Sequence, residues 1–318
     1  MKRHDYFSSQ ARLALTGPDR ARFLHGMVTC DVEKLPVGAG SRAAMLSVKG
    51  RLLATLVVNV LPDELLLTME ASLGEKVRAL LDKHIVMDDV ELHDRGSLHD
   101  DGYYGDDAPE ALATLGFDAS ALRALAPYHH LAHGGFTVAC DPSLGGVGFR
   151  VIGADAPSIG AEMMSGDERE RLRIEAGTAR YGLDLDEERL VVEANLEDAI
   201  SFDKGCYLGQ EVVVRATTRG RVNRKLVGLV VSGVGAAPRG KLTSAAQPEA
   251  GLVTSSVSSP RLGGAIALGY VHRSALDADA PLTLKGASDE ADARTALPVG
   301  LPFDPSAVAA ARARLANP

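Results

Sequence analysis

The chain has 318 residues, of which 46% are hydrophobic and 24% charged, and its formal net charge is −8. This is the balance of a globular protein large enough for two domains, because one hydrophobic core stops growing at about 250–300 residues. The acidic balance argues against a general nucleic-acid binder, which needs a basic surface for phosphate contacts. No secretion signal is evident, and the longest apolar run is too short for a bilayer, so we expect a cytoplasmic protein without membrane association.

Helix and strand patterns are mixed in the first two thirds of the chain. The predicted elements are a helix beginning at Pro18 and Asp19, strands over 44–48, 52–60, 65–69, 136–140 and 148–152, and helices opened by capping boxes at Ser72–Glu75 and Ser165–Glu168. The segment 96–109 is polar and rich in Gly and Asp, which predicts a loop.

After about residue 225 the pattern changes to short β-like runs separated by Gly, Pro and Ser. The runs cover 226–231, 251–254, 265–271 and 282–284, and a terminal helix is predicted over 307–315. Such spacing favours a small antiparallel barrel or sandwich. We therefore predict an α+β fold, with an α+β region over 1–225 and a β-barrel domain over 226–318.

The three cysteines, Cys30, Cys140 and Cys206, are far apart in the sequence. Without a C-x-x-C pair, neither a zinc site nor a cluster-binding motif is indicated, and no metal ligands are predicted. An odd number of isolated cysteines also makes a disulfide framework improbable, as expected in a reducing compartment.

The segment KGCYLGQE at 204–211 is the most informative part of the sequence about function. Two glycines bracket Cys206, and Lys204 lies two positions before it. Glycines permit tight turns, and a nearby cation raises the thiolate fraction of a cysteine. Cys206 is thus a candidate nucleophile, redox-sensitive thiol or transient metal ligand. The alternative is a buried cysteine that packs as a small hydrophobic residue.

This segment resembles the signature of the YgfZ family, and the resemblance extends over nearly the whole chain. The stretches RIEAG at 173–177, YGLD at 181–184 and EANL at 193–196 look like the pterin-binding core of the wider aminomethyltransferase superfamily, which includes the glycine cleavage T-protein. The C-terminal stretches 251–260 and 264–271 resemble its barrel. The resemblance implies an aminomethyltransferase-like folate-binding domain followed by an antiparallel barrel.

The resemblance also implies roles for individual residues. Glu175 would anchor the pterin, because a carboxylate can accept two hydrogen bonds from its 2-amino group and ring N–H. Tyr181 belongs to the same implied site, and Lys204 matches a basic residue near the folate tail. The alternative for Glu175 is an exposed glutamate paired with a neighbouring arginine.

A basic stretch follows the signature. Five cations lie within eleven residues, namely Arg215, Arg219, Arg221, Arg224 and Lys225. They could hold a folate tail, with Arg215 as the candidate ligand, or they could form a solvated charged loop.

One position departs from the T-protein pattern. T-proteins have an aspartate near the reacting folate nitrogen, and the matching position here is Val77. Valine can act neither as an acid nor as a base, which makes aminomethyl transfer doubtful.

The resemblance therefore implies a protein that binds tetrahydrofolate, or a one-carbon derivative of it, and assists the synthesis or repair of iron–sulfur clusters, chiefly 4Fe–4S clusters in client proteins. Cys206 would perform the family-specific step. Two other hypotheses are a folate-dependent aminomethyltransferase and a scaffold that keeps the fold without folate.

Overall fold

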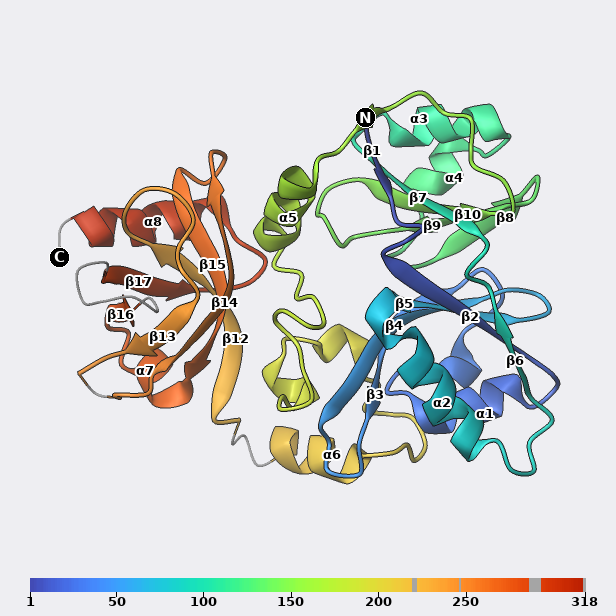
Figure 1. Cartoon of the computed structure of the whole chain (residues 1–318), viewed down its shortest axis with the longest axis horizontal. Coiled ribbons are helices and arrows are strands. Elements are labelled where there is room, and N and C mark those ends of the chain that lie inside the picture. Colours follow the sequence, from blue (N-terminus) through green and yellow to red (C-terminus); the bar gives the residue numbers. More distant parts are fainter. Residues whose placement is uncertain (219–221, 246, 286–292, 317–318) are drawn as a thin grey trace. The chain divides into compact units, whose positions relative to one another are not determined.

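The computed structural model describes residues 1–218, 222–245, 247–285 and 293–316 (Figure 1). Contacts within the chain define two compact units. Unit 1 consists of Met1–Pro142, Gly146–Ser165 and Glu197–Val212, and unit 2 consists of Ser143–Gly145, Gly166–Leu196 and Val213–Pro318. Among the described residues, no helix is both long and apolar enough to cross a membrane.

Unit 1 contains two mostly antiparallel sheets. One has the order β3 (Gly40–Leu46), β4 (Leu52–Val60), β5 (Leu65–Glu70), β2 (Gln10–Thr16) and β6 (Glu91–Asp94). The other has the order β11 (Glu162–Met163), β1 (Lys2–Asp5), β7 (His99–Tyr104), β10 (Gly148–Gly153), β9 (Phe136–Cys140) and β8 (His130–His133). The helices are α1 (Arg20–Met27), α2 (Gly74–His84), α3 (Ala108–Leu112) and α4 (Ala119–Arg123). The strands predicted over 44–48, 52–60, 65–69, 136–140 and 148–152 are confirmed to within a few residues.

The loop predicted over 96–109 is wrong, because it contains β7, which pairs with both β1 and β10. The polar residues of this strand are buried with partners. The Asp100 carboxylate is fully buried and accepts from Arg12 Nη1 at 2.9 Å and from Arg150 Nε at 2.7 Å. Asp101 accepts from Arg3 Nε at 2.7 Å. Ion pairing therefore lets an acidic segment form an interior strand.

The helix predicted after Ser72 exists, but its capping box does not. α2 begins at Gly74, its N-cap is Leu73, and no side chain caps it. Ser72 lies instead in a 3-10 turn over Ala71–Leu73. The apolar stripe is confirmed, since Leu73, Val77 and Leu81 are all buried.

Unit 2 is built on a closed antiparallel barrel, as predicted for the C-terminal part. Its strand order is β12 (Arg224–Val231), β15 (Gly264–His272), β14 (Gly251–Ser259), β13 (Gly240–Thr243), β16 (Leu282–Lys285) and β17 (Arg294–Val299). Strands β13 and β17 were not predicted. The barrel interior is filled by small and branched apolar side chains, among them Leu229, Val253, Val271 and Leu284.

Helices cover the barrel and precede it. They are α5 (Gly166–Glu175), α6 (Gln210–Thr218), α7 (Arg273–Asp277) and α8 (Pro305–Ala316). α5 packs against β14 and β15, and α8 packs against β17 and β12. The remaining short elements are 3-10 turns over Val32–Lys34, Ala113–Leu115, Val191–Glu193 and Glu197–Ala199.

Candidate functional site

The candidate residues fall into both units. Cys206 and Lys204 lie in unit 1, whereas Glu175, Tyr181 and Arg215 lie in unit 2.

Lys204 anchors the signature segment to the end of α1. Its ammonium donates to the carbonyl oxygens of His25, Val28 and Cys30, the last two at 2.8 Å, and the residue is only 7% exposed. Burial lowers the pKa of Lys204 to about 8, while the nearby acidic groups Cys30, Asp31 and Glu33 oppose that shift. All three ammonium protons are thus used within the protein. The folate-tail role of Lys204 stays a prediction that this arrangement does not favour.

Gly209 fixes the other end of the signature turn. Its φ is +84°, and a Cβ at this position would lie 2.5 Å from Ser47 O and 3.0 Å from Leu46 Cβ. A side chain here would therefore push the turn away from the β3–β4 hairpin. Between the two anchors, the Tyr207 ring lies beneath the Lys204 ammonium at 5.0 Å and is buried. The lysine and the glycine thus hold a defined turn around Cys206.

Cys206 is the exposed cysteine of the three. Cys30 is buried, and burial raises its pKa to about 11. Cys140 is half-buried, and burial raises its pKa as well. The buried-packing alternative for Cys206 is therefore wrong. Within the part of the chain that the structure describes, no group of three or more His, Cys, Asp and Glu residues is arranged to hold a metal ion.

We expect N-ethylmaleimide to label Cys206 much faster than the other two cysteines in the native protein, because thiolates react and buried thiols are neither ionised nor accessible. Peptide mass spectrometry after timed labelling measures this. Urea-unfolded protein is the control and should be labelled at all three sites. Equal labelling of Cys30 and Cys206 in the native state would contradict the geometry.

His25 lies beside the signature turn and was not singled out from the sequence. A Cβ at Gly205 would be 3.6 Å from His25 Nε2, so the imidazole adjoins the residue before Cys206. Its Nδ1 is 3.3 Å from Asp31 Oδ1. The Nδ1 atom makes no hydrogen bond with any residue that the structure describes, so the imidazole is a polar neighbour of the turn. Only the fold brings His25 and Gly205 together.

Glu175, at the end of α5, is buried. The alternative prediction of an exposed glutamate is therefore wrong. Its Oε1 accepts from Ser259 Oγ at 2.6 Å, and its Oε2 accepts from Arg261 Nε at 2.8 Å. Arg171 Nη1 lies 3.6 Å away. Both oxygens therefore have partners within unit 2. The Arg261 side chain is 51% exposed. The pterin-anchor role stays a prediction.

A buried ion pair ties α5 to the barrel next to Glu175. Arg173 Nη1 donates to Asp184 Oδ2 at 2.8 Å, and Arg173 Nη2 donates to Ser255 Oγ of β14 at 3.0 Å. Asp184 Oδ1 accepts from Thr254 Oγ1 at 2.6 Å. The motifs 173–177 and 181–184 thus share one polar network with β14. In this network the charged residues stabilise the packing of α5 rather than line a cavity.

The other two residues of this group are less buried. Tyr181 is half-buried and forms an isolated β-bridge with Leu185. Arg215 is exposed on α6, and both residues have interactions within the chain. Of the predicted basic stretch, Arg219 and Arg221 lie outside the described residues.

Val77 is fully buried in α2. At this position the side chain packs into the core of unit 1 and offers no proton acceptor. A separate cavity of about 60 Å³ in unit 1, lined in part by Asn59, Thr68 and Asp141, is well below the ~300–1,000 Å³ of typical small-molecule sites. It has room for a few water molecules.

Comparisons with known proteins support the fold described above. Residues 224–303 match the model of the glycine cleavage T-protein C-terminal barrel domain. The chain is 33% identical over 279 residues to an aminomethyltransferase of Rubrobacter xylanophilus, covering 83% of this chain and 74% of that protein. It is 30% identical over 291 residues to one of Herpetosiphon aurantiacus, covering 85% and 78%. The glycine cleavage aminomethyltransferase T of Bartonella henselae has a similar fold, with a TM-score of 0.82 at 20% identity over 96% of this chain and 86% of that one.

Proposed function

The chain belongs to the aminomethyltransferase family, and from this premise we propose that it is a tetrahydrofolate-binding accessory protein for iron–sulfur clusters. In this proposal it acts in the cytoplasm on client proteins that hold 4Fe–4S clusters. Cys206 performs the family-specific step on those clients or on their clusters.

The observation that supports this proposal is the exposed thiol of Cys206 on a turn fixed at both ends. Lys204 holds one end through three backbone carbonyls, and Gly209 permits the close packing of the other. A reducing cytoplasm keeps such a thiol free. A thiol held rigidly at the surface can contact a partner protein or a cluster iron without any rearrangement of the fold.

The proposal that this chain binds folate is based on its family. Glu175 and Tyr181 would contact the pterin, and Arg215 the acidic tail. Glu175 suits this role only where the ligand replaces Arg261 at Oε2, because a carboxylate binds an amino-pterin edge through both oxygens. Tetrahydrofolate would supply a one-carbon carrier or an electron-rich ring.

The second candidate function is a folate-dependent aminomethyltransferase. The identity of 33% to a protein of that name favours it. The buried Val77 speaks against it, because the matching residue of T-proteins is an acid. The two functions differ in whether a one-carbon unit is turned over.

The test combines a genetic and a binding measurement. The protein is expressed in a bacterial strain that lacks its YgfZ homologue, and the activity of a 4Fe–4S enzyme is assayed. We expect activity to return. Isothermal titration with tetrahydrofolate is expected to give a dissociation constant in the micromolar range, about −8 kcal/mol.

Each outcome separates the candidates. Restored enzyme activity without aminomethyl transfer in vitro supports the cluster role. Aminomethyl transfer without restored activity would replace it with the transferase. Restored activity without tetrahydrofolate binding would leave a scaffold that keeps the fold and has lost the ligand.

A further inference from the structure

The signature segment 204–211 completes the C-terminal end of α1. A helix leaves its last carbonyl oxygens without partners inside the helix, so other groups or water must bond them. The backbone N–H of Leu208 donates to the oxygen of Gly26 at 3.3 Å. The Lys204 ammonium donates to three further carbonyl oxygens at or just after this end, those of His25, Val28 and Cys30. The signature segment thus caps a helix that lies 179 residues earlier in the chain.

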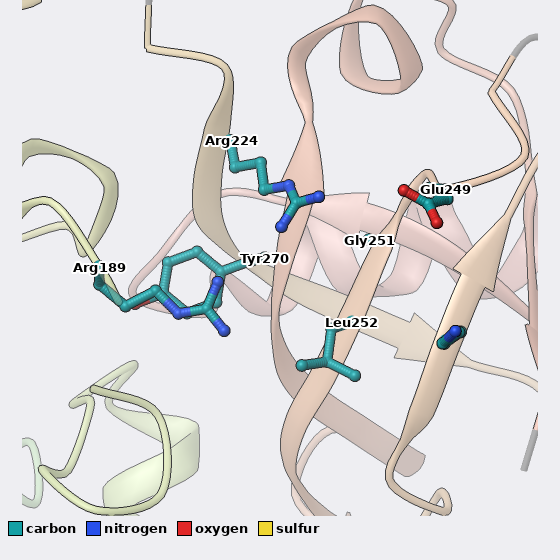
Figure 2. Close-up of a pocket in the computed structure, with 7 residues that line it drawn as sticks. Arg189, Arg224, Glu249, Gly251, Leu252 and Tyr270 are labelled. Atoms are coloured by element: carbon teal, nitrogen blue, oxygen red, sulfur yellow. The ribbon is translucent and has the colours of Figure 1, made fainter. Parts of the chain in front are cut away.

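Lys204 differs from the other buried cations in the described part of the chain, because it has no carboxylate partner. Arg12 and Arg173 each pair with a buried aspartate. In unit 2, Arg189 stacks on the Tyr270 ring, as Figure 2 shows, and lies 3.6 Å from Asp186. Lys204 makes no ion pair with any residue that the structure describes. Its site therefore depends on the number and direction of its N–H donors, because carbonyl oxygens offer only partial charges.

The three carbonyl oxygens form a receptor that suits a primary ammonium group. An ammonium has three N–H donors that diverge from one nitrogen, and each of them has one acceptor here. The partial negative charge at the C-terminal end of a helix favours a cation at this position. The Tyr207 ring, whose centroid is 5.0 Å from Lys204 Nζ, adds a cation–π contact. The receptor is thus complementary to the ammonium in both donors and charge.

We infer that Lys204 is a positioning residue for Cys206, and that the carbonyl oxygens of residues 25–30 bind a free alkylammonium ion when the lysine side chain is removed. The ammonium acts as a tethered cation that fixes the turn and so presents the thiol. This inference deepens the proposed function, because it assigns Lys204 to the thiol and not to the folate tail. Its link to cluster chemistry rests on that function, whereas the test of the turn does not.

The test is chemical rescue of Lys204→Ala in the full-length protein. Alanine keeps Cβ, so the part of the side chain that is missing corresponds to propylammonium. Hydrogen–deuterium exchange with mass spectrometry measures how often the segment 204–211 opens. We expect its exchange to become about tenfold faster or more in the variant, the usual effect of losing hydrogen bonds to a charged group. Propylammonium chloride at about 50 mM should restore the wild-type rate, because that concentration fills a site of millimolar affinity.

Two matched controls isolate the ammonium. Tetramethylammonium chloride at the same concentration has the charge but no N–H donor, so it should not restore the exchange rate. Lys83→Ala removes a lysine that is exposed on α2 in the same unit, and the segment 204–211 should then exchange as in the wild type. If Lys204→Ala does not fold, Lys204→Met replaces it, because methionine keeps the apolar length without the ammonium. Exchange must then become faster in 204–211 and stay unchanged in β3 and β4.

Unchanged exchange of 204–211 in the lysine variants would overturn the positioning role. Faster exchange throughout unit 1 would also overturn it, since the effect would not be confined to the turn. Equal restoration by tetramethylammonium, or no restoration of Lys204→Ala by propylammonium, would overturn the ammonium receptor. If the exchange results hold but the wild-type protein fails to restore the 4Fe–4S enzyme, the proposed function fails and the role of Lys204 in the turn stands.

Discussion

Replacing Asp184 by alanine is expected to lower the free energy of unfolding by about 3–5 kcal/mol, the range for breaking a buried ion pair. The Asp184 carboxylate is fully buried and accepts from Arg173, Thr254 and the backbone N–H of Arg180. Its loss leaves the Arg173 guanidinium, which is 4% exposed, with Glu170 as its remaining carboxylate partner. Urea unfolding followed by circular dichroism measures the change, because the chain has no tryptophan.

The control for this experiment is Asp277→Ala. Asp277 also faces an arginine, Arg273, at 3.5 Å, but its side chain is 68% exposed. Exposed ion pairs contribute little, so a change within about 0.5 kcal/mol is expected. Equal effects of the two substitutions would show that the Arg173–Asp184 pair does not stabilise the packing of α5 on the barrel.

Replacing Cys206 by alanine is expected to abolish rescue of the 4Fe–4S enzyme in a strain without the YgfZ homologue, while the fold stays intact. The thiol is exposed, and substitutions of such surface side chains usually change stability by no more than about 0.5 kcal/mol. Because the loss of function would not come from unfolding, it would assign the chemistry to the thiol. Enzyme activity, soluble protein level and melting temperature are measured together.

Cys140→Ala is the matched control, because it removes one thiol from the same unit at a half-buried position. It should rescue like the wild type. Rescue by Cys206→Ala would keep the cluster role and reduce the cysteine to a structural residue. A melting temperature well below that of the wild type would instead indicate that the turn itself depends on the cysteine.

The barrel and most strands could be predicted from local patterns, since alternating apolar residues and Gly, Pro or Ser boundaries reflect the strand itself. The interior strand β7 could not. Its sequence HDDGYY looks like a loop, and it becomes a strand because Arg3, Arg12 and Arg150 pair with Asp100 and Asp101. Such pairs join residues 50 to 98 positions apart, which no local pattern encodes.

For the candidate site, too, some features depend on the sequence alone and others on the tertiary structure. The segment 204–211 and the missing acid at Val77 are predictions from the sequence alone, because both depend on residue identity. Only the tertiary structure determined which polar groups are already satisfied. Lys204 donates to three carbonyls of the segment 25–30, and Glu175 accepts from Ser259 and Arg261. Hydrogen-bond partners and burial depend on contacts between distant segments, so they decide whether a charged side chain stabilises the fold or remains available to a ligand.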